Sequence, residues 1–317
     1  MSGAIRFDGR VAVVTGAGNG LGRDYAIALA ARGASVVVND LGGSGSGHGA
    51  SHSAADAVVA EIKATGGTAV ASHDSVATRS GGEAIIKTAM DHFKHVDIVI
   101  NNAGFLRNKA FEDMTDAELD PIIDVHLKGA FYVSQPAYRV MKQQRYGRLL
   151  FTSSASGVFG SPLQSNYGAA KAGLVGLTHC VALEGAEYGI LANALLPMSA
   201  SRLAQEMSAE WYAKAKLSPD AALLGSRGTP PYVTPLVLYL VSEACQATRH
   251  IYSALGGRYA RAFVGVGEGM VTEHEVPATP EAIAEHFEAI GSPANYYVPG
   301  SVTDEFTPLL AKLKSLG

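Results

Sequence analysis

The sequence predicts a doubly wound α/β fold, and three observations support this class. Short, fully apolar runs rich in β-branched residues alternate along the chain with segments of helical periodicity. Continuous apolar strands separated by helices are typical of a parallel sheet that is buried on both faces. The chain has 317 residues, of which 47% are hydrophobic, and this is enough to form a sizeable core. We therefore expect a parallel sheet with helices on both sides.

The first two expected strands are VAVVT (11–15), which runs into glycines, and SVVVND (35–40). Between them, residues 21–32 place their apolar side chains on one helical face, and Gly33 closes this helix. The later expected strands have the same apolar character and are DIVINN (97–102), RLLFTS (148–153), LANALL (191–196) and IYSALG (251–256). Pro121 falls inside a helical pattern and predicts a kink or a restart there.

Composition excludes several classes of function. A formal net charge of -4 argues against binding to nucleic acids or anionic membranes, which both require clustered positive charge. Only two cysteines are present, without metal or disulfide spacing, which fits a reducing compartment. The sequence shows no signal peptide, no run of about 18 apolar residues and no peroxisomal address at its SLG end. We expect a cytoplasmic protein that acts on a small molecule, with no catalytic metal.

The segment TGAGNGLG (15–22) follows the first strand and opens the first helix. Glycines at Gly16, Gly20 and Gly22 allow a pyrophosphate to approach the backbone, and the helix N-terminus supplies free N–H groups and a positive dipole end. This spacing differs from GxGxxG, and a ligand-free glycine turn is the alternative interpretation. The strand–turn–helix context favours binding of a dinucleotide.

Asp40 ends the second strand, 18 residues after Gly22 (40 − 22). A carboxylate at this point accepts hydrogen bonds from the adenosine ribose hydroxyls and repels a 2′-phosphate, so Asp40 predicts NAD rather than NADP. The alternative is an aspartate that only caps a turn. The next segment, LGGSGSGHGASH (41–52), is either a flexible connector or a loop beside the cofactor ribose.

Tyr167 and Lys171 form YGAAK at the start of a helical segment, one turn apart on the same face. A nearby ammonium and a cationic nicotinamide both favour the phenolate, so we expect a lowered pKa for Tyr167. Tyr167 would then accept the alcohol proton while hydride leaves for the nicotinamide. Ser154, 13 residues earlier (167 − 154), ends a strand and is placed to hold the substrate oxygen. A surface pair remains the alternative for YxxxK taken alone.

Together, TGAGNGLG, Asp40, NNAG (101–104), Ser154 and YGAAK resemble the short-chain dehydrogenase/reductase family over roughly residues 8–257. Segments such as VVVNDLGG, DVHLKGAF and SNYGAAKAGLVGL are most similar to the (3R)-hydroxyacyl-CoA dehydrogenase modules of peroxisomal multifunctional β-oxidation enzymes. The resemblance implies a Rossmann fold with seven parallel strands. Residues 258–317 have too few apolar residues to form a core of their own, so we expect them to be an extension packed on the same domain. The resemblance also implies a homodimer or homotetramer that pairs through the helix around 121–144 and the YGAAK helix.

The resemblance also implies the site. Tyr167 would be the acid/base, Lys171 its electrostatic partner and ribose ligand, and Ser154 the donor to the substrate oxygen. The cofactor-binding residues implied beside Tyr167 and Lys171 are Gly16, Asn19, Gly20, Leu21, Gly22, Asp40, Asp74, Ser75, Asn102, Ala103, Gly104 and Pro197. His126 stands where the family often has a catalytic asparagine, and either a relay role or a packed helix histidine fits this position.

Residues 198–230 follow the expected strand LANALL (191–196), and Met198, Met207 and Trp211 contribute to their apolar character. They form either a lid over a bulky apolar substrate or ordinary packing against the sheet. The leading function is NAD-dependent dehydrogenation of a 3-hydroxyacyl-CoA or a hydroxysteroid-like alcohol. The alternatives are reduction of another ketone and a non-catalytic NAD sensor, and the presence of both Tyr167 and Lys171 disfavours the sensor.

Overall fold

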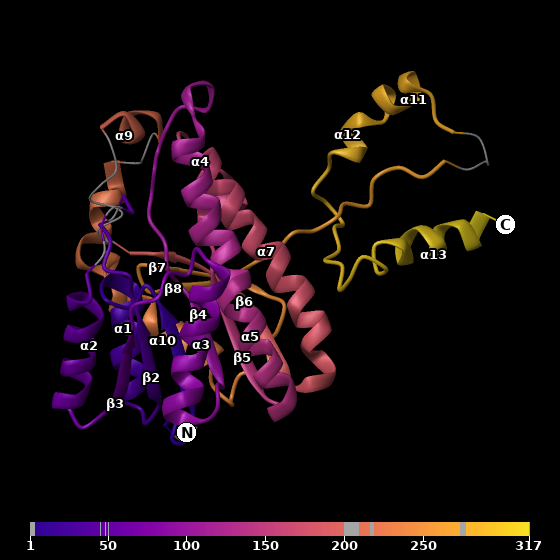
Figure 1. Ribbon diagram of the computed structural model, residues 1–317. Helices are drawn as coiled ribbons and strands as arrows, with labels where there is room; N and C mark the ends of the chain where they lie inside the picture. The colour runs from indigo at the N-terminus through magenta and orange to yellow at the C-terminus, as the bar shows by residue number, and fades with distance from the viewer. Residues whose placement is uncertain are drawn as a thin grey trace. The chain divides into compact units, whose positions relative to one another are not determined.

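The computed structural model describes residues 4–44, 46–47, 49, 51–199, 209–215, 219–272 and 277–316. Its centre is one eight-stranded sheet with the order β3-β2-β1-β4-β5-β6-β7-β8 (Figure 1). The strands are β1 (Val11–Thr15), β2 (Ser35–Asn39), β3 (Thr68–Ser72), β4 (Ile98–Asn101), β5 (Gly147–Thr152), β6 (Ile190–Met198), β7 (Ile251–Leu255) and β8 (Arg258–Ala262). The order reverses between β1 and β4, as expected for a doubly wound sheet.

Helices cover both faces of the sheet. One apolar cluster lies under α1 (Gly20–Ala30), α2 (Ser53–Ala64) and α10 (Thr234–Leu240). The other lies under α3 (Arg79–Phe93), α5 (Gly129–Gln144) and α7 (Ser165–Gly185). Strand β1 divides its residues between the two, with Ala12 and Val14 in the first cluster and Val11 and Val13 in the second. This alternation explains why the strand is apolar throughout.

The fold class and its seven parallel strands are confirmed, and the sheet has in addition an eighth strand that forms one antiparallel pair. Strand β8 returns beside β7 after Gly256 and Gly257, whose φ angles are +56° and +88°. Two successive residues with positive φ are typical of a tight hairpin turn, and glycine adopts them without steric cost. Strand β3, with the sequence TAVAS, is not among the strands expected from the sequence.

Pro121 interrupts the helical region before β5, as its position predicted. Helix α4 (Asp116–Ile122) ends one residue after this proline, and a π-helical segment η2 (Ile123–Lys128) connects it to α5. The remaining helices of the first unit are η1 (Phe111–Asp113), α6 (Ala155–Phe159), η3 (Ala186–Tyr188), α9 (Ala209–Ala215), η4 (Pro219–Gly228) and η5 (Pro230–Tyr232).

The chain divides into two compact units, Met1–Arg261 and Ala262–Gly317. The boundary lies beyond residue 257 because β8 continues the sheet. The second unit contains α11 (Pro280–Glu285), α12 (Phe287–Ile290) and α13 (Phe306–Leu316). That this extension packs on the first unit stays a prediction. Among the helices in the described ranges, none is both long and apolar enough to cross a membrane.

Candidate active site

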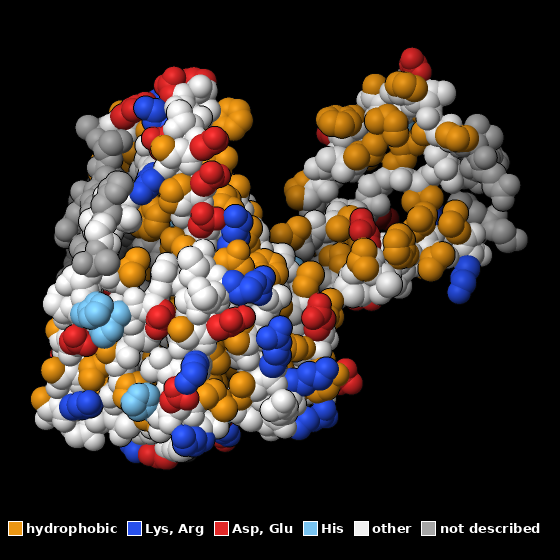
Figure 2. All heavy atoms as spheres, in the orientation of Figure 1, with side chains coloured by type: hydrophobic (Ala, Val, Ile, Leu, Met, Phe, Trp, Pro, Cys, Tyr) orange, Lys and Arg blue, Asp and Glu red, His pale blue; other side chains and the backbone are white. Residues whose placement is uncertain are grey.

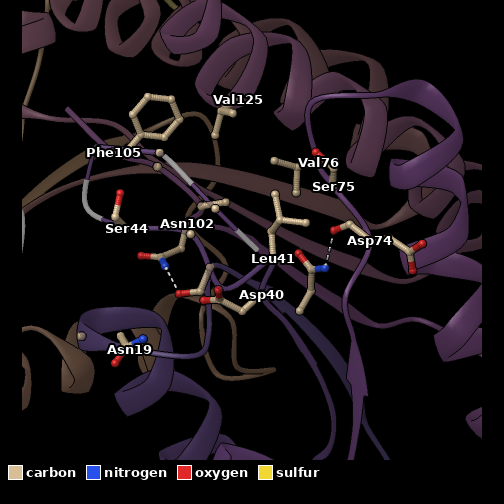
Figure 3. Close-up of a pocket in the computed structure, with 18 of the residues that line it drawn as sticks. Asn19, Asp40, Leu41, Ser44, Asp74, Ser75, Val76, Asn102, Phe105 and Val125 are labelled. Carbon is tan, nitrogen blue, oxygen red and sulfur yellow. Dashed lines mark hydrogen bonds between the residues drawn. The ribbon is translucent and has the colours of Figure 1, made fainter. Parts of the chain in front are cut away.

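A pocket of about 210 Å³ opens along the carboxyl ends of β1, β2 and β4 (Figure 3). Ligands in open α/β sheets bind at this edge, where the strand order reverses. The predicted cofactor residues that line the pocket are Gly16, Asn19, Gly20, Leu21, Asp40, Asp74, Ser75, Asn102, Ala103 and Gly104. The structure therefore brings together residues from four separate loops around one cavity.

The phosphate cradle is built from the turn between β1 and α1. Asn19 precedes α1 without a side-chain cap, and the first turn of this helix carries no acidic residue. Its free N–H groups therefore remain suited to an anion. Gly22 lies behind the pocket, where a Cβ would come 2.3 Å from the carbonyl oxygen of Gly16. The absence of a side chain at Gly22 thus allows the helix to approach the turn closely.

Two carboxylates line the adenosine end of the pocket. The carboxylate of Asp40 accepts hydrogen bonds from the backbone N–H groups of Gly18 (2.8 Å) and Gly42 (2.6 Å). Asp40 therefore does cap a turn, but a carboxylate has about four acceptor positions, and two suffice for these contacts. The second carboxylate, Asp74, accepts from the Ser72 hydroxyl at 3.1 Å. None of the described residues that line this pocket is a lysine or an arginine.

The glycine-rich loop after β2 forms one wall of the pocket, which agrees with the second of its two interpretations. Gly43, Ser44, Gly47 and Gly49 all line the cavity. A Cβ on Gly47 would come 2.7 Å from the ring of Phe105, so the loop backbone lies directly against that ring. Glycine is needed here both for this close approach and for the φ of +80°.

The expected catalytic side chains meet at the start of α7. Lys171 is 3% exposed, and its ammonium donates to the carbonyl oxygen of Thr152 at 2.5 Å. The ammonium lies 5.5 Å from the ring centre of Tyr167. Ser154 precedes α6, where its hydroxyl accepts from the backbone N–H of Ser156 at 3.1 Å, and it lies close enough to Tyr167 to act on the pKa of that phenol. The Ser–Tyr–Lys group is therefore assembled in the protein.

The expected lowering of the tyrosine pKa depends on the nicotinamide charge, because the protein groups alone act in the opposite direction. Burial raises the pKa of Tyr167 above its ordinary value, and the hydrogen bond with Ser154 offsets only part of this effect. Burial also lowers the pKa of Lys171 to about 7. The protein groups alone thus keep the phenol protonated at neutral pH, because the Tyr167 side chain is buried.

His126 lies in the π-helical segment η2 and is 3% exposed. Its Nε2 atom lies 2.8 Å from the carbonyl oxygen and 3.1 Å from the amide nitrogen of Phe105. Burial, with a smaller effect of the Lys171 charge, lowers its pKa well below the usual range, so the ring is neutral at pH 7. The ring also explains Gly104, because a Cβ there would come 2.2 Å from His126 Cε1. These contacts fit a packed histidine, and the relay role stays a prediction.

A second cavity of about 10 Å³ lies beside this histidine, and its lining includes Lys171, Asn101 and Thr15. This volume is close to the minimum for a single water molecule. The Nδ1 atom of His126 and the Oγ1 atom of Thr152 are buried without a hydrogen-bond partner in the protein. The surroundings of Lys171 are therefore polar and tightly packed.

The remaining predicted residues lie elsewhere or outside the description. Pro197 belongs to β6 and does not line the first pocket. Met198 is 41% exposed at the end of the same strand. The indole of Trp211, on α9, donates to the Ser161 hydroxyl at 3.0 Å, which connects this segment to the loop before α7. Met207 lies outside the described residues.

Four lining residues were absent from both the predicted cofactor set and the predicted loop 41–52, namely Asn39, Val76, Phe105 and Val125. Asn39 precedes Asp40, so its neighbourhood alone was a usable signal. Asn39 donates to the backbone oxygen of Asp74 at 2.9 Å and thereby connects the ends of β2 and β3. Val125 lies on η2, far from the glycine motif in sequence, and no local pattern indicates its place in the pocket.

Comparison with known proteins agrees with this geometry. A family model described as short chain dehydrogenase matches residues 10–212. The chain is 42% identical to mouse peroxisomal multifunctional enzyme type 2 over 325 residues, covering 100% of this chain but only 42% of the mouse protein. It is 48% identical to a short-chain type dehydrogenase/reductase of Mycobacterium tuberculosis over 252 residues, which covers 80% of this chain and 84% of that protein.

Two solved structures have the same fold. Full-length peroxisomal multifunctional enzyme type 2 of Drosophila melanogaster matches with a TM-score of 0.80 and 35% identity, covering 98% of this chain and 51% of that chain. A short chain dehydrogenase of Mycobacterium avium matches with a TM-score of 0.76 and 35% identity, covering 92% and 99% of the two chains. This chain belongs to the short-chain dehydrogenase/reductase family and is an oxidoreductase.

Proposed function

We propose that this enzyme transfers hydride between NAD and the secondary alcohol of a 3-hydroxyacyl thioester. The assembly of Ser154, Tyr167 and Lys171 at the same sheet edge as the dinucleotide pocket carries this proposal. Relatives named 3-oxoacyl-[acyl-carrier-protein] reductase support the substrate class, at 40% identity in Synechocystis and 41% in Staphylococcus aureus. Reduction of another ketone is the alternative, and a non-catalytic sensor is disfavoured because the catalytic group is complete.

The residues of the pocket fit NAD, which supplies the hydride acceptor when it is bound. The uncapped start of α1 suits the pyrophosphate, and the carboxylate of Asp40 suits the ribose hydroxyls. The Ser154 hydroxyl orients the alcohol oxygen, and Tyr167 receives its proton. The positive charge of the oxidised nicotinamide favours the phenolate, and so does the ammonium of Lys171. In the reduction, Tyr167 returns the proton to the same oxygen.

The preference for NAD over NADP follows from Asp40. The described lining residues of the pocket include two carboxylates and no basic side chain. A 2′-phosphate bound there would therefore be repelled by like charge. Asp40→Ala combined with Leu41→Arg should shift the ratio of kcat/KM for NAD to that for NADP toward NADP by at least about tenfold. Comparable kcat/KM values for both cofactors in the wild-type enzyme would contradict the assignment.

The substrate preference is tested with 3-hydroxyacyl-CoAs of increasing length. Each methylene that becomes buried contributes up to about 0.8 kcal/mol. Four additional carbons should thus raise kcat/KM by roughly two orders of magnitude, less the cost of ordering the chain. Trp211→Ala should flatten this dependence while activity on a short alcohol is retained. The matched control is Tyr239→Ala, because Tyr239 is half-exposed and lies outside residues 198–230. This variant should leave the dependence of kcat/KM on chain length unchanged.

Equal kcat/KM for 2-butanol and a long-chain 3-hydroxyacyl-CoA would exclude the bulky substrate and favour the reductase of simple ketones. If Trp211→Ala lowers stability and all activities together, residues 198–230 only pack against the sheet. A flattened chain-length dependence with unchanged stability supports the lid.

We also propose a homodimer or homotetramer that pairs through α5 and α7. Phe131 on α5 is 40% exposed, and Leu183 on α7 is 51% exposed. The small residues Ala169, Ala172 and Gly176 on α7 allow close approach of a second helix. Light scattering at micromolar concentration should give a multiple of the 32.9 kDa chain mass, and a clean monomer would contradict the proposal.

A further inference from the structure

We propose that Arg107 is a positioning residue that couples the glycine-rich loop over the cofactor pocket to the catalytic tyrosine. This inference rests on the proposed function, because it assigns the pocket to NAD. Arg107 itself lines no part of the pocket, and it follows the NNAG segment by three residues (107 − 104). Its side chain contacts the glycine-rich loop, and its backbone carbonyl accepts a hydrogen bond from Asn166.

The side chain of Arg107 secures the loop. Its Nε donates to the backbone oxygen of Ser46 at 3.2 Å, and Ser46 lies between lining residues Ser44 and Gly47. The guanidinium also lies 5.3 Å from the ring centre of Phe105, against which Gly47 packs. The loop carries many glycines and so has a large conformational entropy to lose on ordering. A charged donor from outside the loop is therefore well suited to stabilise its ordered position.

The same guanidinium is anchored to α4 by a consequence of Pro121. In an α-helix, the carbonyl of Ala117 would accept from the N–H of residue 121, but proline has no N–H. The Nη1 atom of Arg107 donates to this carbonyl oxygen at 2.5 Å. The helix break at Pro121 thus provides a fixed acceptor that holds the arginine side chain in one orientation.

The backbone of Arg107 connects to the catalytic helix through Asn166. Asn166 is 1% exposed, and its Nδ2 donates to the carbonyl oxygens of Arg107 (3.0 Å) and Glu118 (2.8 Å). Its Oδ1 accepts from the backbone N–H of Tyr167 at 2.7 Å. The amide of Asn166 therefore uses both its donor and its acceptor to join the loop after β4, helix α4 and the first turn of α7.

These contacts form one continuous path from the loop at Ser46, through Arg107 and Asn166, to the backbone of Tyr167. Displacement of the loop disturbs the arginine, and displacement of the arginine removes an acceptor from the buried asparagine. Since residues in one hydrogen-bond network act non-additively, the two positions should be energetically coupled. Contact between NAD and the ordered loop would then favour the catalytic position of Tyr167.

The experiment uses the full chain and compares Arg107→Ala, Arg107→Lys, Asn166→Ala and the double variant Arg107→Ala/Asn166→Ala. The matched control is Arg145→Ala. That arginine lies 5.2 Å from the ring centre of Tyr188, a distance similar to that of Arg107 from Phe105, but it precedes β5 at the opposite edge of the sheet. The readouts are the NADH dissociation constant from NADH fluorescence, hydrogen exchange around Ser46 and kcat with 3-oxodecanoyl-CoA.

Arg107→Ala should raise the NADH dissociation constant about tenfold and accelerate exchange around Ser46, because two hydrogen bonds from a charged donor are lost. Arg107→Lys should recover part of the affinity, since one charged donor remains. Asn166→Ala should lower kcat about tenfold with little change in NADH binding. In the double variant, the loss of kcat/KM should be smaller than the product of the single losses. The control should match the wild type in all three readouts.

Wild-type NADH affinity and loop exchange in Arg107→Ala would overturn the proposal, and so would exactly multiplicative effects in the double variant. A loss of melting temperature with unchanged affinity in both arginine variants would likewise reduce Arg107 to a structural role. If the wild-type enzyme binds no NADH, the proposed function fails. The exchange comparison around Ser46 then still decides whether Arg107 holds the loop.

Discussion

The units Met1–Arg261 and Ala262–Gly317 differ most in how they bury apolar side chains. Among the described residues, every buried side chain belongs to the first unit. In the second unit, large apolar residues such as Phe287 (66% exposed), Val302 (73%) and Phe306 (52%) remain open to solvent, and Figure 2 shows many of its hydrophobic side chains at the surface. Local helical patterns occur in both units, but only in the first do the described residues form a buried core. Substitutions should therefore have very different effects in the two units.

The largest difference should appear in catalysis. Tyr167→Phe should lower kcat by about three orders of magnitude, because it removes the general acid/base, and should leave NADH binding nearly intact. The matched substitution in the second unit is Tyr296→Phe, at a side chain that is 51% exposed, and kcat should stay unchanged there. Steady-state kinetics combined with NADH fluorescence measures both quantities. Near-wild-type kcat in Tyr167→Phe would refute the mechanism.

A smaller difference should appear in stability. Gly104→Ala places a Cβ 2.2 Å from the ring of His126, which the Phe105 backbone holds in position. Overpacking of this kind costs about 1–3 kcal/mol of the free energy of unfolding. In Gly291→Ala the added Cβ would lie 3.3 Å from its nearest neighbour, the carbonyl oxygen of Phe287. This substitution should change the free energy of unfolding by less than about 0.5 kcal/mol. Equal denaturation midpoints for the two variants would show that His126 moves freely.

The smallest expected difference concerns how the free energy of unfolding depends on pH. The pKa of Lys171 is about 7 in the folded protein and near 10.5 in the unfolded chain. Between these values the unfolded state binds more protons, so stability rises with pH by up to about 1.4 kcal/mol per unit. Lys171→Met should reduce this slope between pH 7 and 9, whereas Lys314→Met, at an exposed residue of the second unit, should retain it. An unchanged slope in Lys171→Met would place the lysine in contact with water.

The sequence predicted most of the first unit because its signals are local. The glycines before α1, Asp40 at the end of β2 and the YGAAK pair each combine a residue type with a position on a strand or helix. Strand β3, with the sequence TAVAS, was missed because only two of its five residues are buried, so it lacks a continuous apolar run. The hairpin to β8 depends on two glycines and on polar residues that resemble a loop.

Other features were beyond local patterns because they depend on tertiary contacts. The place of Phe105 in the pocket follows from its packing on Gly47, 58 residues earlier (105 − 47). The raised pKa of Tyr167 follows from burial, which spacing alone does not report. The direction of the Lys171 ammonium toward Thr152 likewise depends on the fold around it. The sequence therefore identified the chemical groups, and packing determined their electrostatics.

The most direct test is the rate of NADH formation from NAD and 3-hydroxydecanoyl-CoA by the purified wild-type enzyme, with the same reaction run on NADP. The proposed function predicts steady turnover with NAD and a kcat/KM at least about tenfold lower with NADP, because the Asp40 carboxylate in the pocket lining would repel a 2′-phosphate. An absence of turnover with NAD, or an equal rate with NADP, would contradict it.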